Sequence, residues 1–337
     1  MSSISMDIPT LQVNHKDLQN FVSFIYKHER LLKDFGAIKI QLNSDCKLAL
    51  KKRRKNTVLC PIIEQFVKIS KNDPVYFVQK VDHIEESIQQ SSPITDECSF
   101  WSSLSCSSNK RRQMNISILP NKSFFYQKTS RIYFDIHRLP NQSLLKLGGS
   151  KLTRRFVPYV KRAHGPGAIF PLTSAQQRLF SVDYHHEGGA HHWYIIPTRE
   201  REVLQRVIDY QNASICLDHG QLLIDPSVLD KNHVRYHRIV QRPNEFVVLS
   251  AGTLGQSFTE DASWSESIAF ALPSWIEEGH ASVSSSLCQY NNLHVSLPDI
   301  IDVTLFRHGL IQRYINSYLN TITDHKSLAL KGLLWCL

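Results

Sequence analysis

Apolar residues recur at helical spacing between residues 14 and 35. The positions that share one face of such a helix, with a period of about 3.6 residues, are Leu18, Phe21, Val22, Ile25, Leu32 and Phe35. Asn14 is suited to cap the first turn, and Gly36 is suited to end the last one. Residues 37–40 then begin a short strand. The pattern predicts a small helix-then-strand unit that has to dock on a larger body, because it cannot bury its apolar face alone.

A period of two appears in residues 179–197, LFSVDYHHEGGAHHWYIIP. Apolar and polar positions alternate in the manner of a half-buried strand: Phe180, Ser181, Val182, Asp183 and Tyr184. An aromatic and β-branched run resumes at Trp193. Gly188 and Gly189 lie between the two runs and tolerate the positive φ angles of a close turn. The stretch therefore predicts a tight β-hairpin whose second arm ends at Pro197.

Short apolar runs broken by Pro and Gly fill the middle of the chain. Strands are indicated at residues 246–249 and 267–271, and a helix at residues 199–210. Residues 124–275 therefore predict a β-barrel or β-sandwich with one inserted helical region. A helical spacing of apolar residues returns over 311–322, which predicts a C-terminal helix that packs on the rest of the protein.

Composition supports a globular protein with a substantial core, since 42% of the 337 residues are apolar and 20% are charged. No apolar run reaches the ~18 residues of a membrane span, and no secretory signal is recognisable. We therefore expect a soluble, intracellular protein with no membrane partner. Its seven cysteines should be mostly reduced thiols in such a compartment.

The net charge of +9 favours polyanionic partners, but the positive charge is unevenly distributed. The densest basic run is Lys51, Lys52, Arg53, Arg54 and Lys55. It predicts a nuclear-import signal or a nucleic-acid patch, and the alternative is a solvated loop. A looser basic group is typical of the solvent-exposed side of a connecting segment: Lys151, Arg154, Arg155, Lys161 and Arg162. The serine-rich stretch 87–112 predicts an exposed insertion, with Phe100 and Trp101 as its anchors.

Common catalytic motifs are absent. There is no Walker loop, no dinucleotide fingerprint and no nucleophile elbow. No serine stands on a recognisable elbow beside an identified base, so Ser/His/Asp catalysis has no support in the sequence.

The stretch around residue 183 resembles a known motif, W-H-x-E-D-x-x-L-Y-S-x-N-Y-x-H-x-G-x-x-K-x-W-Y, of the JmjC (jumonji) family. Here the same frame reads LTSAQQRLFSVDYHHEGGAHHWYIIP. Residues 241–275 are similar to the second JmjC signature without a gap. Residues 8–40 resemble the JmjN segment that accompanies JmjC barrels in histone lysine demethylases.

This resemblance implies a mainly β fold with α-helices, namely a double-stranded β-helix or cupin-like jelly roll with flanking helices and a small JmjN unit. The expected divisions are a JmjN-like unit at 8–45, a basic and serine-rich connection at 46–123, a JmjC-like barrel at 124–290, a helical segment at 291–323 and a tail at 324–337. The family holds Fe(II) and 2-oxoglutarate and removes methyl groups from histone lysines.

The residues that carry this chemistry in the family are replaced here. The three metal-ligand positions fall on Thr173, Ala175 and Gly255. The two cosubstrate positions fall on Asp183 and His191. An aspartate repels a dicarboxylate, and a neutral histidine does not replace a fixed ammonium. We therefore expect no catalytic residue and no cofactor in this barrel.

Two other metal sites remain open as hypotheses. His185, Glu187 and His191 crowd the predicted hairpin and are candidates for displaced iron ligands, although the alternative is ordinary polar residues of a turn. Some family members also hold a structural zinc ion, and its region here offers Cys216, His219 and Cys288. A closed zinc site needs four ligands, so a degraded site with buried free thiols is the favoured interpretation.

The resemblance leads to two functional hypotheses. The first is a nuclear, chromatin-associated pseudo-demethylase that acts as an interaction or regulatory scaffold, with histone tails, other nuclear proteins or non-specific DNA as partners. The second is an active Fe(II)/2-oxoglutarate-dependent demethylase or protein hydroxylase with displaced metal ligands. The two differ in whether the barrel binds iron and consumes 2-oxoglutarate.

Overall fold

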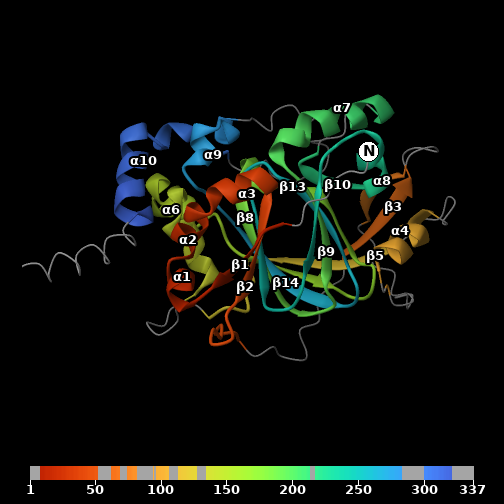
Figure 1. Cartoon of the computed structure of the whole chain (residues 1–337), viewed down its shortest axis with the longest axis horizontal. Coiled ribbons are helices and arrows are strands. Elements are labelled where there is room, and N and C mark those ends of the chain that lie inside the picture. Colours follow the sequence, from red (N-terminus) through yellow and green to blue (C-terminus); the bar gives the residue numbers. More distant parts are fainter. Residues whose placement is uncertain are drawn as a thin grey trace, which may run out of the picture.

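The structure is a computed structural model that describes residues 8–51, 62–68, 74–81, 94, 96–105, 113–126, 134–212, 217–282 and 300–320. Two mostly antiparallel sheets face each other and form a cupin-like barrel, as the sequence predicts (Figure 1). Helices α1, α2, α6 and α10 gather at the left of the view, and α4, α7 and α8 lie at the right. The mainly β fold with flanking helices is confirmed.

The strands of the described residues are β1 Thr10–Val13, β2 Ala37–Leu42, β3 Ile62–Lys68, β4 Val75–Val81, β5 Gln113–Pro120, β6 Tyr159–Ala163, β7 Ile169–Thr173, β8 Phe180–Gly188, β9 His191–Ile196, β10 His219–Ile224, β11 His237–Gln241, β12 Glu245–Leu249, β13 Leu254–Thr259 and β14 Ser263–Phe270. The α-helices are α1 His15–Gln19, α2 Phe21–Lys27, α3 Glu29–Phe35, α4 Glu97–Ser105, α5 Leu139–Gln142, α6 Gly149–Thr153, α7 Arg201–Asn212, α8 Pro226–Lys231, α9 Ser274–Glu277 and α10 His308–Tyr314. Neighbouring strands follow the order β1-β2-β12-β8-β14-β6-β5-β3-β4-β10-β7-β13-β9-β11.

The N-terminal unit begins and ends where its local signals predict. The Asn14 side chain accepts hydrogen bonds from the first turn of α1, and the Asp17 carboxylate accepts one from the Asn14 backbone N–H, which completes a capping box. Gly36 ends α3 in the left-handed conformation with φ of 76°. The predicted single helix is instead three short ones, α1 to α3. Strand β2 then pairs with β12 of the barrel, which docks the unit.

The predicted hairpin at residues 179–197 is wrong. Strand β8 pairs with β12 and β14, whereas β9 pairs with β11 and β13, so the two arms belong to opposite sheets. Gly188 and Gly189 carry the chain between the sheets. A Cβ atom on Gly188 would lie 2.0 Å from the Ala262 carbonyl oxygen, and one on Gly189 would lie 2.2 Å from the Asp261 nitrogen. The glycines are needed for this close approach rather than for a two-residue turn.

Strand β8 is buried on both faces, because helices cover one face and the barrel interior lies against the other. The apolar positions Phe180, Val182 and Tyr184 belong to the large core that the N-terminal and C-terminal helices share with the sheet. The alternating polar positions point the other way, and Asp183 is 4% exposed. The period of two is therefore confirmed, but its polar side faces the barrel interior rather than solvent.

Strands from the connecting region join the barrel. The strands β3, β4 and β5 link the two sheets through pairings with β10 and β6. Helix α4, within the serine-rich stretch, is anchored by the two predicted aromatic residues. Phe100 is fully buried and stacks on Phe258 at 3.9 Å between ring centroids, and Trp101 donates a hydrogen bond of 2.7 Å to the Tyr194 hydroxyl.

Within the described part of the chain, no helix combines the length and the apolar character that crossing a membrane requires.

Candidate functional site in the barrel

Two of the three expected metal positions are neighbours in the barrel. Thr173 ends β7 and lies directly opposite Gly255 of β13 in the antiparallel register. Ala175 follows two residues later, at the start of a short 3-10 helix. The fold therefore brings together positions 82 residues apart in the chain, as the sequence frame requires.

The side chains at these positions offer a metal no ligand set. The Thr173 hydroxyl donates to the carbonyl oxygens of Ser174 and Asp218, at 3.2 and 3.1 Å. Ala175 has no donor atom. A Cβ atom on Gly255 would meet Leu249, Trp193 and Ile195 side-chain carbons at 3.3–3.6 Å, so apolar groups surround this position. Fe(II) sites need nitrogen or carboxylate ligands on adjacent positions, and these residues supply none.

The first cosubstrate position, Asp183, holds a buried ion pair. Its carboxylate contacts the Lys161 ammonium, and the two side chains are 5% and 9% exposed. The Ser267 hydroxyl donates to the same carboxylate. The Gln241 amide donates to the other carboxylate oxygen at 3.3 Å. The prediction that Lys161 lies on the solvent-exposed side of a connecting segment is wrong, because β6 directs this side chain toward the barrel interior.

The second cosubstrate position, His191, is a neutral imidazole. Burial lowers its pKa well below the usual value, and His185 and Lys161 act in the same direction. Its Nε2 atom lies 2.7 Å from the Ser263 hydroxyl, and its ring stacks against Phe170. A histidine held in this way carries no positive charge to bind a carboxylate.

The rings of His185 and His191 lie side by side, with centroids 4.6 Å apart. Both residues are fully buried. Neither ring nitrogen of His185 has a hydrogen-bond partner among the described residues, and the same holds for Nδ1 of His191. Burial lowers the pKa of His185 to about 4, against smaller raising contributions from Asp183 and the Gly188 backbone. Glu187, the third candidate ligand, is exposed at the end of β8.

Among the described residues, one group of three metal-ligand side chains has its atoms close together, and it lies in the N-terminal unit: His15, Asp45 and Cys46. The three candidate ligands His185, Glu187 and His191 form no such group. His192, the remaining histidine of β9, lies 2.8 Å from Glu260, and its ring stacks on Phe258.

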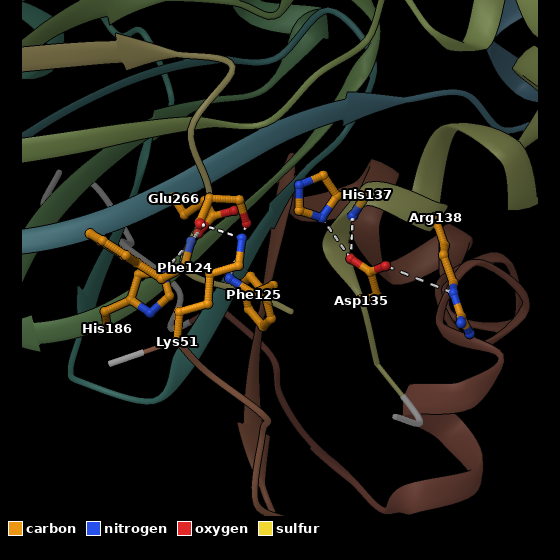
Figure 2. Close-up of polar contacts among 9 residues, drawn as sticks. Lys51, Phe124, Phe125, Asp135, His137, Arg138, His186 and Glu266 are labelled. Carbon is orange, nitrogen blue, oxygen red and sulfur yellow. Dashed lines mark hydrogen bonds and ion pairs between the residues drawn. The ribbon is translucent and has the colours of Figure 1, made fainter. Parts of the chain in front are cut away.

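His186 contacts Glu266 of the neighbouring strand β14 (Figure 2). It is the extra residue of a β-bulge where β8 pairs with β14. Its Nε2 atom lies 3.1 Å from a carboxylate oxygen of Glu266, and the same oxygen accepts a hydrogen bond of 3.0 Å from the Phe124 backbone. Figure 2 also shows Asp135 with His137 and Arg138, a local cluster that caps the next helical turn. These contacts hold the chain segments that carry Phe124 and Asp135 in place.

Several predicted sites fall partly outside the described residues. Of the basic run, Lys51 is described, and residues 52–55 are not. Of the zinc candidates, Cys216 and Cys288 lie outside the described residues, as does the side chain of His219. Cys46 and Cys98 are free thiols, the first buried and the second exposed.

Residues 164–270 match the family described as "JmjC domain, hydroxylase". These residues form a JmjC domain. The chain is homologous to JmjC lysine demethylases: it is 32% identical over 153 residues to "Lysine-specific demethylase 4D" of Rattus norvegicus, covering 44% of this chain and 29% of that protein. It is 34% identical over 107 residues to "Probable lysine-specific demethylase 4F" of Homo sapiens, covering 30% of this chain and 17% of that protein.

A further relative is "Lid2 complex component lid2" of Schizosaccharomyces pombe, which is 26% identical over 217 residues, covering 57% of this chain and 14% of that protein. The chain therefore spans less than a third of the length of each of these relatives.

JmjC domains typically use Fe(II) and 2-oxoglutarate, but the residues present here do not fit either group. The positions that the sequence frame assigns to the metal carry a hydroxyl, a methyl group and a glycine. The cosubstrate positions carry a carboxylate that is already paired and an imidazole that is neutral. Hydrogen bonds hold the strands around these positions: Trp193 donates to Gln241 at 2.8 Å, and Glu245 accepts from the Arg242 backbone at 2.7 Å.

Proposed function

We propose that this protein is a catalytically inactive JmjC pseudo-demethylase that acts in the nucleus as an interaction or regulatory scaffold on chromatin. The observation that supports the proposal is the pairing of Thr173 with Gly255, because neither residue supplies a nitrogen or carboxylate ligand where the sequence frame expects a metal. The relatives named lysine-specific demethylases support a histone-tail or other nuclear protein partner. The net charge of +9 supports additional non-specific contact with DNA.

The proposal also divides the chain. Residues 8–45 are assigned to a JmjN-like unit, 46–123 to a connection, 124–290 to the barrel, 291–323 to a C-terminal helical segment and 324–337 to a tail. The contacts of β2 with β12 support the first assignment, since this unit extends a sheet of the barrel.

The competing function is an active dioxygenase with displaced ligands. The observation that favours it is that the rings of His185 and His191 are adjacent. Both ring nitrogens of His185 and the Nδ1 atom of His191 have no hydrogen-bond partner among the described residues. Two histidines without a carboxylate fall short of the facial triad that activates oxygen. The exposed position of Glu187 supports the non-catalytic function over this alternative.

Purification under anaerobic conditions, followed by metal analysis and a 2-oxoglutarate turnover assay, separates the two functions. We expect iron far below one equivalent and no succinate above the background of a boiled sample. Stoichiometric iron with succinate formation would contradict the pseudoenzyme. A His185→Ala/His191→Ala variant is the matched control, because it removes the displaced-ligand candidates and should abolish any such turnover.

Binding to reconstituted nucleosomes and to histone-tail peptides tests the scaffold. The logarithm of the nucleosome association constant is expected to fall linearly with the logarithm of salt concentration, because phosphate contacts release counterions. Replacing Lys52, Arg53, Arg54 and Lys55 with glutamine should reduce this slope. Four glutamine substitutions at Lys151, Arg154, Arg155 and Arg162 are the control, because they spare Lys161. Absence of binding to nucleosomes, histone peptides and DNA at low salt would remove support for the scaffold.

A further inference from the structure

The Lys161–Asp183 pair spans three strands of one sheet. Strand β14 lies between β6 and β8, and Lys161 is opposite Ser265 while Asp183 is opposite Ser267. The two charged side chains therefore meet across the small serine residues of β14. A buried charge is costly unless it is paired and hydrogen-bonded, so this arrangement needs every one of its contacts.

The surroundings of the Asp183 carboxylate have the composition of a binding site for a small carboxylate. An ammonium, a hydroxyl and an amide donate to it from Lys161, Ser267 and Gln241. These residues come from different strands, β6, β14 and β11. The Lys161 ammonium also lies over two aromatic rings, at 5.1 Å from Phe170 and 5.2 Å from Trp193. Charge-assisted bonds in a dry, aromatic-walled site are strong.

We propose that Lys161, Ser267 and Gln241 form a carboxylate-binding site inside the barrel, and that Asp183 is its built-in ligand. The carboxylate of Asp183 takes the place of an external acid. The wild-type barrel accordingly excludes 2-oxoglutarate and other small acids, because the cation that would attract them is already neutralised. This inference deepens the proposed non-catalytic function and rests on it.

The charges around the Lys161–Asp183 pair support exclusion. Among the described residues, His185 and His191 lie close to this pair, and burial lowers the pKa of both. A second carboxylate entering the same space would face Asp183 without a second cation to balance it. Lys39, another cation close to the barrel, is engaged by Glu245 at 3.3 Å and by the Val240 carbonyl at 3.2 Å.

Chemical rescue of an Asp183→Ala variant tests the proposal. Alanine removes the carboxylate and leaves room for formate or acetate beside the unpaired Lys161. The full chain is heated in sodium formate, sodium acetate or sodium 2-oxoglutarate, each compared with sodium chloride at equal ionic strength. We expect formate to raise the unfolding midpoint of Asp183→Ala by about 2 °C for each tenfold increase beyond its dissociation constant. Wild type should show no difference between formate and chloride.

Two matched variants locate the effect. Asp183→Asn keeps the volume and removes the charge, so it leaves no room and should show no rescue. Asp183→Ala/Lys161→Met leaves room but no cation and should also show none. An equal response of the double variant and of Asp183→Ala would overturn the proposal, since it would reveal binding of formate elsewhere. Absence of any response in Asp183→Ala would overturn it as well.

A second measurement keeps the proposal testable if Asp183→Ala folds too poorly for thermal unfolding. The yield of refolding from urea is compared in formate and in chloride, and formate should increase it several-fold for Asp183→Ala alone. The outcome is separable from that of the turnover assay. Succinate formation by the wild-type protein would contradict the proposed function, whereas failed rescue with no turnover would contradict only the built-in ligand.

Discussion

At the residue scale, the barrel interior is held together by polar and charged side chains that bind one another. Trp193 donates to Gln241, and Glu245 accepts from the Arg242 backbone, so polar contacts hold the strands that line it. Lys161 and Asp183 then form a pair that neither residue could form alone. Isolated, each would be an uncompensated buried charge.

The Lys161–Asp183 pair gives a stability prediction. Lys161→Met should lower the free energy of unfolding by about 3–5 kcal/mol, because it leaves the Asp183 carboxylate buried and unpaired. Lys161→Met/Asp183→Leu should recover most of this loss, since both charges are then replaced by apolar groups. Urea unfolding measures the resulting coupling. Lys151→Met, at an exposed position of α6, is the control and should change stability little; additive effects of the two interior substitutions would contradict the pairing.

Buried histidines predict a loss of stability in acid. The pKa of His185 falls from an ordinary 6.5 to about 4 on folding, chiefly through burial. The unfolded chain therefore binds more protons than the folded protein between these values, and stability decreases as pH falls from about 6.5 to about 4. One such group accounts for about 3 kcal/mol when the fall is complete. His191 contributes in the same direction.

Thermal unfolding across this pH range measures the effect. His185→Leu should flatten the dependence of the midpoint on pH. His308→Gln, at an exposed position of α10, should leave it unchanged. Parallel pH profiles for wild type and His185→Leu would show that this imidazole is not the source of the acid sensitivity.

At the element scale, the decisive feature is the crossing from β8 to β9. Both strands have the residue pattern of hairpin arms, but each finds its partners in a different sheet. Close packing of Gly188 and Gly189 against the residues that precede β14 makes this crossing compact. The polar residues of β8 consequently face those of β9 across the barrel interior.

A substitution at the crossing tests this role. Gly188 has a φ of 100°, and an added Cβ atom would lie 2.0 Å from the Ala262 carbonyl oxygen. Gly188→Ala should therefore destabilise the protein by roughly 3 kcal/mol or more, through strain and displaced backbone. Gly165→Ala is the control, because nothing lies within 4 Å of its added Cβ atom. Equal unfolding midpoints in urea for the two variants would contradict the close approach.

At the scale of the whole molecule, the N-terminal unit and the barrel share one core. Phe21 of α2 is 1% exposed, and its ring lies 5.2 Å from that of Phe134 and 5.3 Å from that of Phe246. The C-terminal helical segment reaches the same layer, where the Ser23 hydroxyl donates to the Tyr318 carbonyl at 2.8 Å. Segments from both ends of the described chain thus cover one face of β8 and β12.

The shared core predicts cooperative unfolding. Phe21→Ala should cost about 3–5 kcal/mol and should lower the stability of the barrel along with that of the N-terminal unit. Tryptophan fluorescence, which includes Trp193 inside the barrel, and far-ultraviolet circular dichroism should report one coincident transition. Leu31→Ala, at a position 36% exposed, is the control. A barrel transition unaffected by Phe21→Ala would show that the two parts fold independently.

Local signals in the sequence predicted the features that local physics decides. The cap at Asn14 and the stop at Gly36 depend on residues within one turn, and both are confirmed. The family frame predicted the cupin-like fold, and it assigned to one expected metal site two residues, Thr173 and Gly255, that prove to be paired across β7 and β13. These predictions needed only neighbouring residues or a fixed spacing along the chain.

Tertiary structure alone decided the rest. A Gly-Gly pair has the same local freedom in a hairpin as in a crossing between sheets, so only the partners of β8 and β9 distinguish the two. The sequence also did not predict the burial of Lys161. Its carboxylate partner, Asp183, lies on β8, and β14 separates this strand from the strand of Lys161. The sequence by itself determined which chemical groups the barrel carries, and the fold decided that two opposite charges among them neutralise each other.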